Sequence, residues 1–240
     1  MHKKNRVVRK KGFYKLINGD CLEIMKQIPE HSVDMILCDP PYGIDYQSNR
    51  VSKEKRKDKI LNDKKPFTMF IPEVKRIIKS NSSVMIFTRW DVQQKFIDCM
   101  YENELYVKNV IIWDKVIHGM GDLKRSYGSR YESILFHSEN KFRFNGKRPQ
   151  DIITCKRVSA GNMVHPNEKP IGLLETLITQ CSLSNNIVLD LFMGSGSTGV
   201  ACMQTGRRFI GIELNEHYFD VSCRRIEEAH KQKKQDYGEW

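Results

Sequence analysis

The 240-residue sequence predicts an α/β fold in which a mostly parallel sheet carries helices on both faces. Short apolar runs typical of buried strands alternate with segments of helical apolar spacing at both ends of the chain. The length suits one sizeable α/β domain or two small ones. The composition, 40% hydrophobic and 29% charged, is that of an ordinary globular protein.

The first half of the chain shows this alternation clearly. Helices are expected at 21–28, 66–80 and 92–103, and strands at 13–20, 33–38, 83–88 and 107–115. Pro29 follows the end of the first helix. Pro72 is tolerable only near a helix start, so the second helix is expected to begin close to it. Asp91 is a suitable cap for the third helix.

The second half repeats the pattern after two irregular stretches. Residues 116–130 are glycine-rich, basic and aromatic, and 139–164 are irregular and basic. Strands are expected at 131–138, 186–192 and 207–214, and helices at 171–182, after the glycine-rich loop that starts at 193, and at 215–233. Asn215 is the expected cap of the last helix.

Positive charge points to an acidic partner. The net charge is +11 and the pI is about 9.3, which favours nucleic acid, with solubility alone as the alternative. Residues 50–65 are rich in lysine and arginine and are expected to form a loop that could close over a phosphate backbone, unless they are merely a solvated charged loop. The candidate nucleic-acid contacts are Lys55, Arg56, Lys57, Arg125, Arg130, Lys147 and Arg148.

Several classes of protein are disfavoured. No run of 18 or more apolar residues is present, so no transmembrane helix is expected. The basic N-terminus lacks the apolar core of a secretory signal. The seven cysteines are scattered and odd in number, which indicates reduced thiols of a cytosolic protein. The histidines and cysteines show no metal-ligand spacing, so no metal site is expected.

The motif Asp39-Pro40-Pro41-Tyr42 directly follows the buried strand 33–38. Ligands of open α/β sheets bind just outside the carboxyl ends of strands. The prolines fix the backbone and remove two donors, so their carbonyls remain as acceptors beside a carboxylate and an aromatic ring. Such an edge suits a planar group that carries an NH2, for example a nucleobase. A plain strand followed by a turn is the alternative reading of the same residues.

A second motif, Gly194-x-Gly196-x-x-Gly199, lies between strand 186–192 and a helix, and Glu213 ends the next strand. Glycines allow the backbone to approach a cofactor closely, and the carboxylate suits ribose hydroxyls. The pattern alone is weak, but this context favours an adenosine-type cofactor over a simple turn. NAD and S-adenosylmethionine both fit this motif.

The two motifs together favour S-adenosylmethionine, because a nicotinamide enzyme has no need of an acceptor-lined pocket for an amine. The lone pair of a ring amine is delocalised, so the nitrogen is a poor nucleophile. Hydrogen bonds to Asp39 and to the Pro40 carbonyl would localise that lone pair, and Tyr42 could stack on the base. The methyl group would pass directly, and a base inside a duplex must first be flipped out.

In these residues the chain resembles the N6-adenine/N4-cytosine DNA amino-methyltransferases in their beta arrangement. The matching segments are INGD at 17–20, DPPYG at 39–43, NVIIWDK at 109–115, HPNEKP at 165–170, LDLFMGSGSTG at 189–199 and IGIE at 210–213. They cover nearly the whole chain in the permuted order, with the catalytic motif first. The family's usual loop is D-P-F-x-G-S-G-T-T, and here Leu191 replaces the proline and Ser197-Thr198 replaces Thr-Thr.

The resemblance implies the S-adenosylmethionine-dependent methyltransferase fold, which is Rossmann-like with a mostly parallel seven-stranded sheet. One domain would span 1–240. It would comprise a basic tail at 1–12, a catalytic half at 13–115, a target-recognition insert at 116–164 and a cofactor-binding half at 165–240.

The resemblance also implies a cofactor site. Glu213 would hold the ribose, Asp20 and Cys21 would lie at the adenine ring, and Asp39 near the cofactor amine. The segment that closes the pocket contains His165 and Lys169. The remaining expected cofactor residues are Asp190, Phe192, Gly194, Ser195, Gly196, Ser197, Thr198 and Leu214. The expected catalytic residues are Asp39, Pro40, Pro41 and Tyr42.

The expected reaction is methylation of adenine N6 in a short DNA sequence, because in this family DPPY rather than SPPY is usually associated with adenine. Cytosine N4, or the same chemistry on RNA, is the alternative. The intact motifs argue against a non-catalytic nucleic-acid binder, and no proton-relay set supports a nicotinamide oxidoreductase. The expected partners are DNA, a second copy of the chain and a cognate restriction endonuclease, in the cytoplasm of a prokaryotic cell or from a phage.

Overall fold

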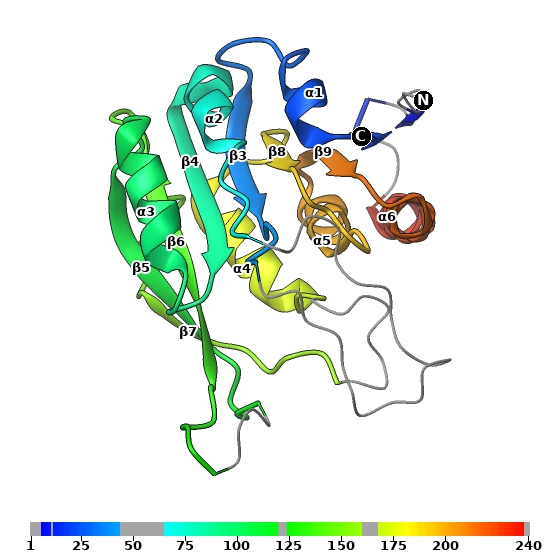
Figure 1. Cartoon of the computed structure of the whole chain (residues 1–240). Coiled ribbons are helices and arrows are strands. Elements are labelled where there is room, and N and C mark those ends of the chain that lie inside the picture. Colours follow the sequence, from blue (N-terminus) through cyan, green and yellow to red (C-terminus); the bar gives the residue numbers. More distant parts are fainter. Residues whose placement is uncertain (1–5, 11, 44–64, 120–123, 160–167, 238–240) are drawn as a thin grey trace.

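A nine-stranded sheet forms the centre of the protein (Figure 1). The computed structural model describes residues 6–10, 12–43, 65–119, 124–159 and 168–237. The strands, in chain order, are β1 (Arg6–Lys10), β2 (Tyr14–Asn18), β3 (Val33–Cys38), β4 (Ile78–Thr88), β5 (Val107–Asp114), β6 (Tyr131–Ser138), β7 (Ile152–Thr154), β8 (Ile187–Asp190) and β9 (Arg208–Glu213). The helices are α1 (Cys21–Met25), α2 (Ile71–Ile77), α3 (Gln93–Glu102), α4 (Ile171–Cys181), α5 (Ser197–Thr205) and α6 (Glu216–Tyr237).

The strand order is β1-β2-β9-β8-β3-β4-β6-β5-β7, and its central part from β2 to β4 is parallel. β6 is antiparallel to both β4 and β5, so those two strands point the same way. Parallel neighbours need crossover connections, which place helices on the faces of the sheet. α2 packs with α3, and α4, α5 and α6 pack in series. In Figure 1, α2 and α3 lie on the near side of the sheet and α4 lies behind it.

The core is continuous across both faces. β3 is buried at every position, because it lies between β8 and β4 in the middle of the sheet. The largest fully buried side chains include Phe70, Phe96, Phe209 and Phe219. Burial of an aromatic side chain of this size stabilises the fold by roughly 1.5–3 kcal/mol. The predicted α/β class with a mostly parallel sheet is therefore confirmed.

The sheet has nine strands where seven were expected, and the two additional strands lie at its edges. β1 pairs with β2 in an antiparallel hairpin, with Gly12 at a φ of +76° in the connection. β7 pairs with β5. The sequence predicts neither strand, because residues 1–12 read as a basic tail and residues 139–164 as irregular. Short edge strands of this kind depend on a free strand edge beside them, which local sequence does not reveal.

Several predicted boundaries and one predicted cap are wrong. α1 ends at Met25, whereas the helix was predicted to reach residue 28. α2 ends at Ile77, and β4 begins at the next residue, so residues 78–82 are strand where the first three were expected to be helix. Asp91 does not cap α3. Its carboxylate instead pairs with Arg89, with Nη2 to Oδ2 at 2.8 Å. Asn215 does cap α6, because its Oδ1 accepts from the Tyr218 backbone N–H at 3.2 Å.

The parallel centre brings the carboxyl ends of β2, β9, β8, β3 and β4 to one edge of the sheet, where binding sites of such sheets lie. None of the helices within the described ranges combines the length and apolar character that a membrane crossing would require.

Candidate functional site

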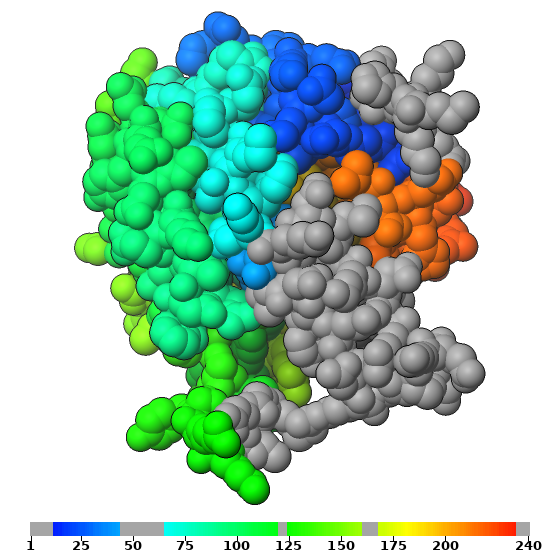
Figure 2. Space-filling model, viewed as in Figure 1, coloured from blue at the N-terminus to red at the C-terminus, as the bar shows by residue number. Residues whose placement is uncertain are grey.

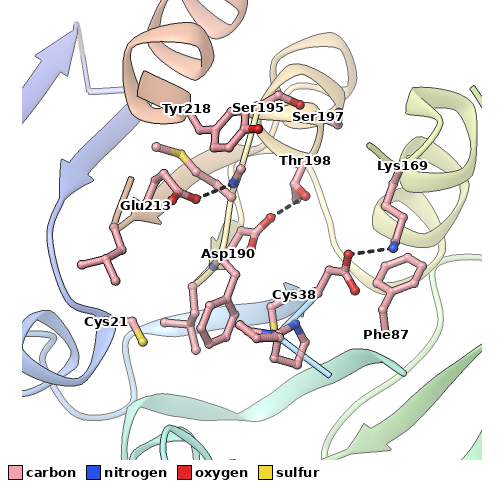
Figure 3. A pocket seen from close by; sticks show the side chains of 18 of the residues that line it. Cys21, Cys38, Phe87, Lys169, Asp190, Ser195, Ser197, Thr198, Glu213 and Tyr218 are labelled. Carbon is pink, nitrogen blue, oxygen red and sulfur yellow. Dashed lines mark hydrogen bonds and ion pairs between the residues drawn. The ribbon is translucent and has the colours of Figure 1, made fainter. Parts of the chain in front are cut away.

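One cavity at the carboxyl edge joins the two sequence motifs (Figure 3). Most of its lining residues lie at the ends of β2, β3, β8 and β9 and in the first turn of α5. Others come from the segment before α2 and from the end of β4, the start of α4 and the start of α6. The predicted residues on this lining are Asp20, Cys21, Asp39, Pro40, Pro41, Lys169, Asp190, Phe192, Gly194, Ser195, Ser197, Thr198, Glu213 and Leu214. Segments that are distant in sequence therefore form a single site.

The glycine loop is tied at both ends by Asp190, the last residue of β8. Its Oδ1 accepts from the Phe192 backbone N–H at 3.0 Å, and its Oδ2 accepts from the Thr198 hydroxyl at 2.7 Å. Burial raises the pKa of Asp190 to about 7, although these two hydrogen bonds oppose the shift. Asp190 thus fixes the loop between strand and helix rather than presenting an open carboxylate.

Glu213, at the end of β9, closes the loop from the other side. Its Oε2 accepts from the Gly194 backbone N–H at 2.9 Å, and its Oε1 accepts from the Asn215 N–H at 2.7 Å. Burial raises the pKa of Glu213 above its ordinary value, while these backbone N–H groups lower it. A carboxylate offers about four lone-pair positions, so acceptor capacity remains for hydroxyl groups in the cavity.

Gly196 does not line the cavity, contrary to the prediction, although it opens α5 with a φ of +84°. A Cβ built there would lie 2.8 Å from the Cβ of Ser222 on α6. The second glycine of the motif therefore permits close packing of α5 against α6. Gly199 does the same, because a Cβ there would lie 2.4 Å from Cδ1 of Ile226.

Asp20 and Cys21 lie where β2 passes into α1. The Asp20 carboxylate is the N-cap of α1, accepting from the Leu22 N–H at 2.9 Å, and it reaches the same cavity. Cys21 is buried, and burial raises its thiol pKa to about 12. It therefore acts as an apolar wall residue rather than a reactive thiolate.

Asp39 lies on the cavity wall at the end of β3 and is bound from two sides. Its Oδ2 accepts from Lys169 Nζ at 2.7 Å, and its Oδ1 accepts from the Tyr42 hydroxyl. Burial raises the pKa of Asp39, and the Glu132 carboxylate raises it further, whereas the Lys169 ammonium lowers it. Figure 3 shows Lys169 directed toward this carboxylate and lying beside Phe87.

The sequence predicts that both proline carbonyls are free acceptors, and this is wrong for one of them. The Pro41 carbonyl accepts from the Phe67 N–H at 3.0 Å. No donor among the described residues reaches the Pro40 carbonyl. Tyr42 also departs from the stacking role expected for it. Its ring is buried and its hydroxyl is bound to Asp39, so in this structure it orients the carboxylate.

Several residues of the site are not among those that the sequence predicts. Phe67, Phe87, Met193, Glu168, Asn215 and Tyr218 line the cavity. Outside the lining, Arg225 on α6 donates to the Ser195 carbonyl at 3.0 Å and to Glu168 at 2.6 Å, which links the glycine loop to the segment before α4. Glu132 pairs with Lys169 at 3.0 Å. Met193 and Glu168 lie inside the motifs LDLFMGSGSTG and HPNEKP, which could have indicated them. The others are single residues contributed by the tertiary fold, and no local motif marks them.

The basic residues proposed for nucleic acid are dispersed. Arg130 is paired with Asp114 through Nε to Oδ1 and Nη2 to Oδ2, both at 2.6 Å. Arg125 is exposed between β5 and β6. Lys147 and Arg148 are exposed on the segment before β7, and Arg148 borders a different depression with Phe144 and Gln180. Lys55, Arg56, Lys57 and His165 lie outside the described residues.

Comparisons with known proteins agree with this geometry. The family model N6_N4_Mtase, described as DNA methylase, matches residues 33–224. The chain is 30% identical over 251 residues to DNA adenine methyltransferase YhdJ of Escherichia coli, covering 89% of this chain and 83% of that protein.

Two solved structures are also similar. The crystal structure of the M1.HpyAVI–SAM complex has a TM-score of 0.66 and 26% identity, covering 88% of this chain and 99% of that one. The cytosine-N4-specific PvuII DNA methyltransferase has a TM-score of 0.71 but only 16% identity, covering 91% and 92%, so it supports the fold alone.

Proposed function

The chain belongs to the N6/N4 DNA methylase family, and we propose that it transfers the methyl group of S-adenosylmethionine to the N6 amino group of adenine in DNA. One observation carries the proposal: a single cavity holds the glycine loop and Glu213 together with Asp39 and Pro40. The relative named as a DNA adenine methyltransferase supports adenine as the base. The structural relative in complex with SAM supports the methyl donor.

The cavity suits S-adenosylmethionine. Ser197, the first residue of α5, lines the cavity, and its buried hydroxyl has no hydrogen-bond partner within the described part of the chain. The N-terminus of a helix favours a carboxylate such as that of the methionine portion. Glu213 retains lone pairs for ribose hydroxyls. When bound, this cofactor supplies an electrophilic methyl group on its sulfonium sulfur.

The residues of the chain would prepare the amine for attack. The Asp39 carboxylate and the Pro40 carbonyl, which no donor among the described residues reaches, are two acceptors for the two N–H bonds of an exocyclic amine. Hydrogen bonds to both would localise the nitrogen lone pair and orient it. Lys169 would favour the ionised form of Asp39, because its ammonium opposes the rise in pKa that burial causes. The Asp39 side chain is 17% exposed, so a base paired in a duplex must be flipped out to reach it.

Target reading is proposed for residues 116–164. The part between β5 and β6 projects beyond the sheet at the same edge as Asp39 (Figures 1 and 2). Its exposed groups include Arg125 and the fully exposed ring of Tyr127. A second copy of the chain and a cognate restriction endonuclease are proposed partners. The proposed setting is the cytoplasm of a bacterium, where DNA and the methyl donor occur together.

Methyl-labelled S-adenosylmethionine incubated with DNA, followed by nucleoside analysis, tests the proposal. Label in N6-methyladenine is expected. Label in N4-methylcytosine would contradict the choice of base, label appearing with RNA alone would contradict the choice of DNA, and no transfer to any nucleic acid would contradict the activity.

The Asp39→Asn variant tests the catalytic assignment. It keeps the shape of the side chain but weakens its acceptor strength, so the rate should fall about a hundredfold or more. Cofactor binding measured by calorimetry and the melting temperature serve as controls for the fold. A variant with an undiminished rate would show that the methyl transfer does not depend on this carboxylate.

A further inference from the structure

The catalytic carboxylate is one end of a ladder of alternating charges. Lys115 Nζ lies 2.6 Å from Glu132 Oε1, and Lys169 Nζ lies 3.0 Å from Glu132 Oε2 and 2.7 Å from Asp39 Oδ2. All four side chains are at least four-fifths buried, with exposed fractions of 18%, 18%, 9% and 17% in the order Lys115, Glu132, Lys169, Asp39. Buried charges require partners of opposite sign, so each member constrains the next.

Aromatic rings lie beside the two ammonium groups of this ladder. Lys169 Nζ lies 4.8 Å from the centre of the Phe87 ring and 6.0 Å from that of Trp113. Lys115 Nζ lies 5.3 Å from the Trp113 ring. Trp113 is itself fixed, because its indole N–H donates to the Cys155 carbonyl at 2.7 Å. The ammonium of Lys169 is therefore directed to its two carboxylates, Asp39 and Glu132.

The ladder also reaches the segment between β5 and β6. Lys115 immediately follows β5, and Glu132 is the second residue of β6, so the two residues bracket that segment. The Lys115 N–H donates to the Arg130 carbonyl at 2.9 Å, and Arg130 pairs with Asp114. A movement of the segment would act on Glu132 and Lys115 before it reached Lys169.

We propose that Glu132 is a positioning residue for methyl transfer: with Lys115 it holds the Lys169 ammonium against Asp39 and couples the segment between β5 and β6 to the catalytic carboxylate. The inference rests on the proposed function. Glu132 does not line the cavity and acts through Lys169. Loss of Glu132 should therefore disturb the orientation of the Asp39 carboxylate and leave the lining of the cofactor cavity intact.

The test compares Glu132→Gln with a matched variant, Glu139→Gln. Glu139 follows the other end of β6, has a side chain that is 14% exposed, and pairs with Lys75 at 2.6 Å, so it loses a similar ion pair far from Asp39. The rate at saturating DNA and cofactor should fall about tenfold or more in Glu132→Gln and stay within about twofold of wild type in Glu139→Gln. The KM for the cofactor should stay within about twofold in both.

The pH profile of that saturated rate separates positioning from general loosening. The titratable or charged groups that face Asp39 are Lys169 from the segment before α4, Glu132 from β6, Tyr42 and Cys38 from its own strand and turn, and Asp190 from β8. Glu132 raises the pKa of Asp39, so its neutralisation should lower that pKa. The acid limb should therefore move to lower pH in Glu132→Gln, and Glu132→Asp should return it toward its original position.

Three results would overturn the proposal. They are a wild-type rate in Glu132→Gln, equal losses in the two glutamine variants, and a lowered rate with an unmoved acid limb. Should Glu132→Gln fail to fold, Lys115→Met provides the second route, because it removes the outer cation and should also lower the saturated rate without changing the KM for the cofactor. If the wild-type protein transfers no methyl group, the proposed function itself fails, which is a different outcome.

Discussion

At the scale of single residues, Asp190 gives the clearest pH-dependent effect. Its folded-state pKa of about 7 lies above the ordinary value of 3.8, because the carboxyl is buried. The folded protein therefore holds a proton that the unfolded chain releases, and stability falls as pH rises between about 4 and 7.

The Asp190→Asn variant isolates this effect. Relative to wild type, the variant should gain about 2–4 kcal/mol of unfolding free energy as the pH rises from 4 to 7.5. Urea unfolding at a series of pH values measures it. A difference that is constant across this range would show that the raised pKa of Asp190 is not a source of pH-dependent stability.

Ser197 provides a second residue-scale prediction. Its buried, unpartnered hydroxyl lines the cavity, so Ser197→Ala should weaken S-adenosylmethionine binding about tenfold and leave stability nearly unchanged. Ser82→Ala is the matched control, because Ser82 is also buried with an unpartnered hydroxyl among the described residues but lies outside the cavity. Calorimetric titration measures the affinity of both variants for S-adenosylmethionine. Equal affinities in the two variants would contradict the assignment of Ser197 to the cofactor site.

At the scale of elements, alanine substitutions at two glycines distinguish a glycine needed for close packing from one that only adds chain entropy. Gly196→Ala places a Cβ 2.8 Å from Ser222 at a left-handed φ, and should destabilise the contact between α5 and α6 by about 1–3 kcal/mol. Gly172→Ala in α4 meets nothing within 4 Å, and should stabilise by about 0.5–1 kcal/mol. Urea unfolding of the two variants measures both changes. A neutral Gly196→Ala would contradict the packing role given to that glycine.

Elements were predictable from sequence where local pattern and tertiary setting agree. The buried run of β3 and the strand–loop–helix at β8 and α5 carry strong periodic signals, and the structure has them at the expected places. The start of β4 is not predictable from local sequence because Ser80 and Asn81 are polar. The strand begins where Ile78 pairs with Val33 of β3, and the register shifts before Ser83 pairs with Met35. β1 and β7 depend in the same way on available strand edges.

The candidate site follows the same rule. The motif residues Asp39 and Glu213 could be named from their positions, because Asp39 follows β3 and Glu213 ends β9. Their partners could not be named, since the contact between Lys169 and Asp39 joins positions 130 residues apart and depends on the packed fold. Tyr42 was misjudged for the same reason, because its burial and its bond to Asp39 exist only after folding.

At the scale of the whole molecule, the shape predicts where DNA should lie. The net charge of +11 favours association with a polyanion, but charge alone does not select a face. The carboxyl edge identifies that face, because the cavity lined by Asp39 lies there. The segment between β5 and β6 projects from the same edge (Figure 2). A duplex held against this edge would meet the exposed ring of Tyr127.

The Tyr127→Ala variant tests that orientation. A fully exposed aromatic ring that stacks on a base or sugar contributes about 1–3 kcal/mol, so DNA affinity should fall about fivefold or more while cofactor affinity stays unchanged. Tyr101→Ala is the control, because Tyr101 is an exposed tyrosine near the end of α3, where the chain returns toward the start of β5 at the opposite edge. Fluorescence anisotropy with a labelled duplex measures the DNA affinity of both variants. Equal losses in the two variants, or a loss only in Tyr101→Ala, would place the DNA on a different face of the molecule.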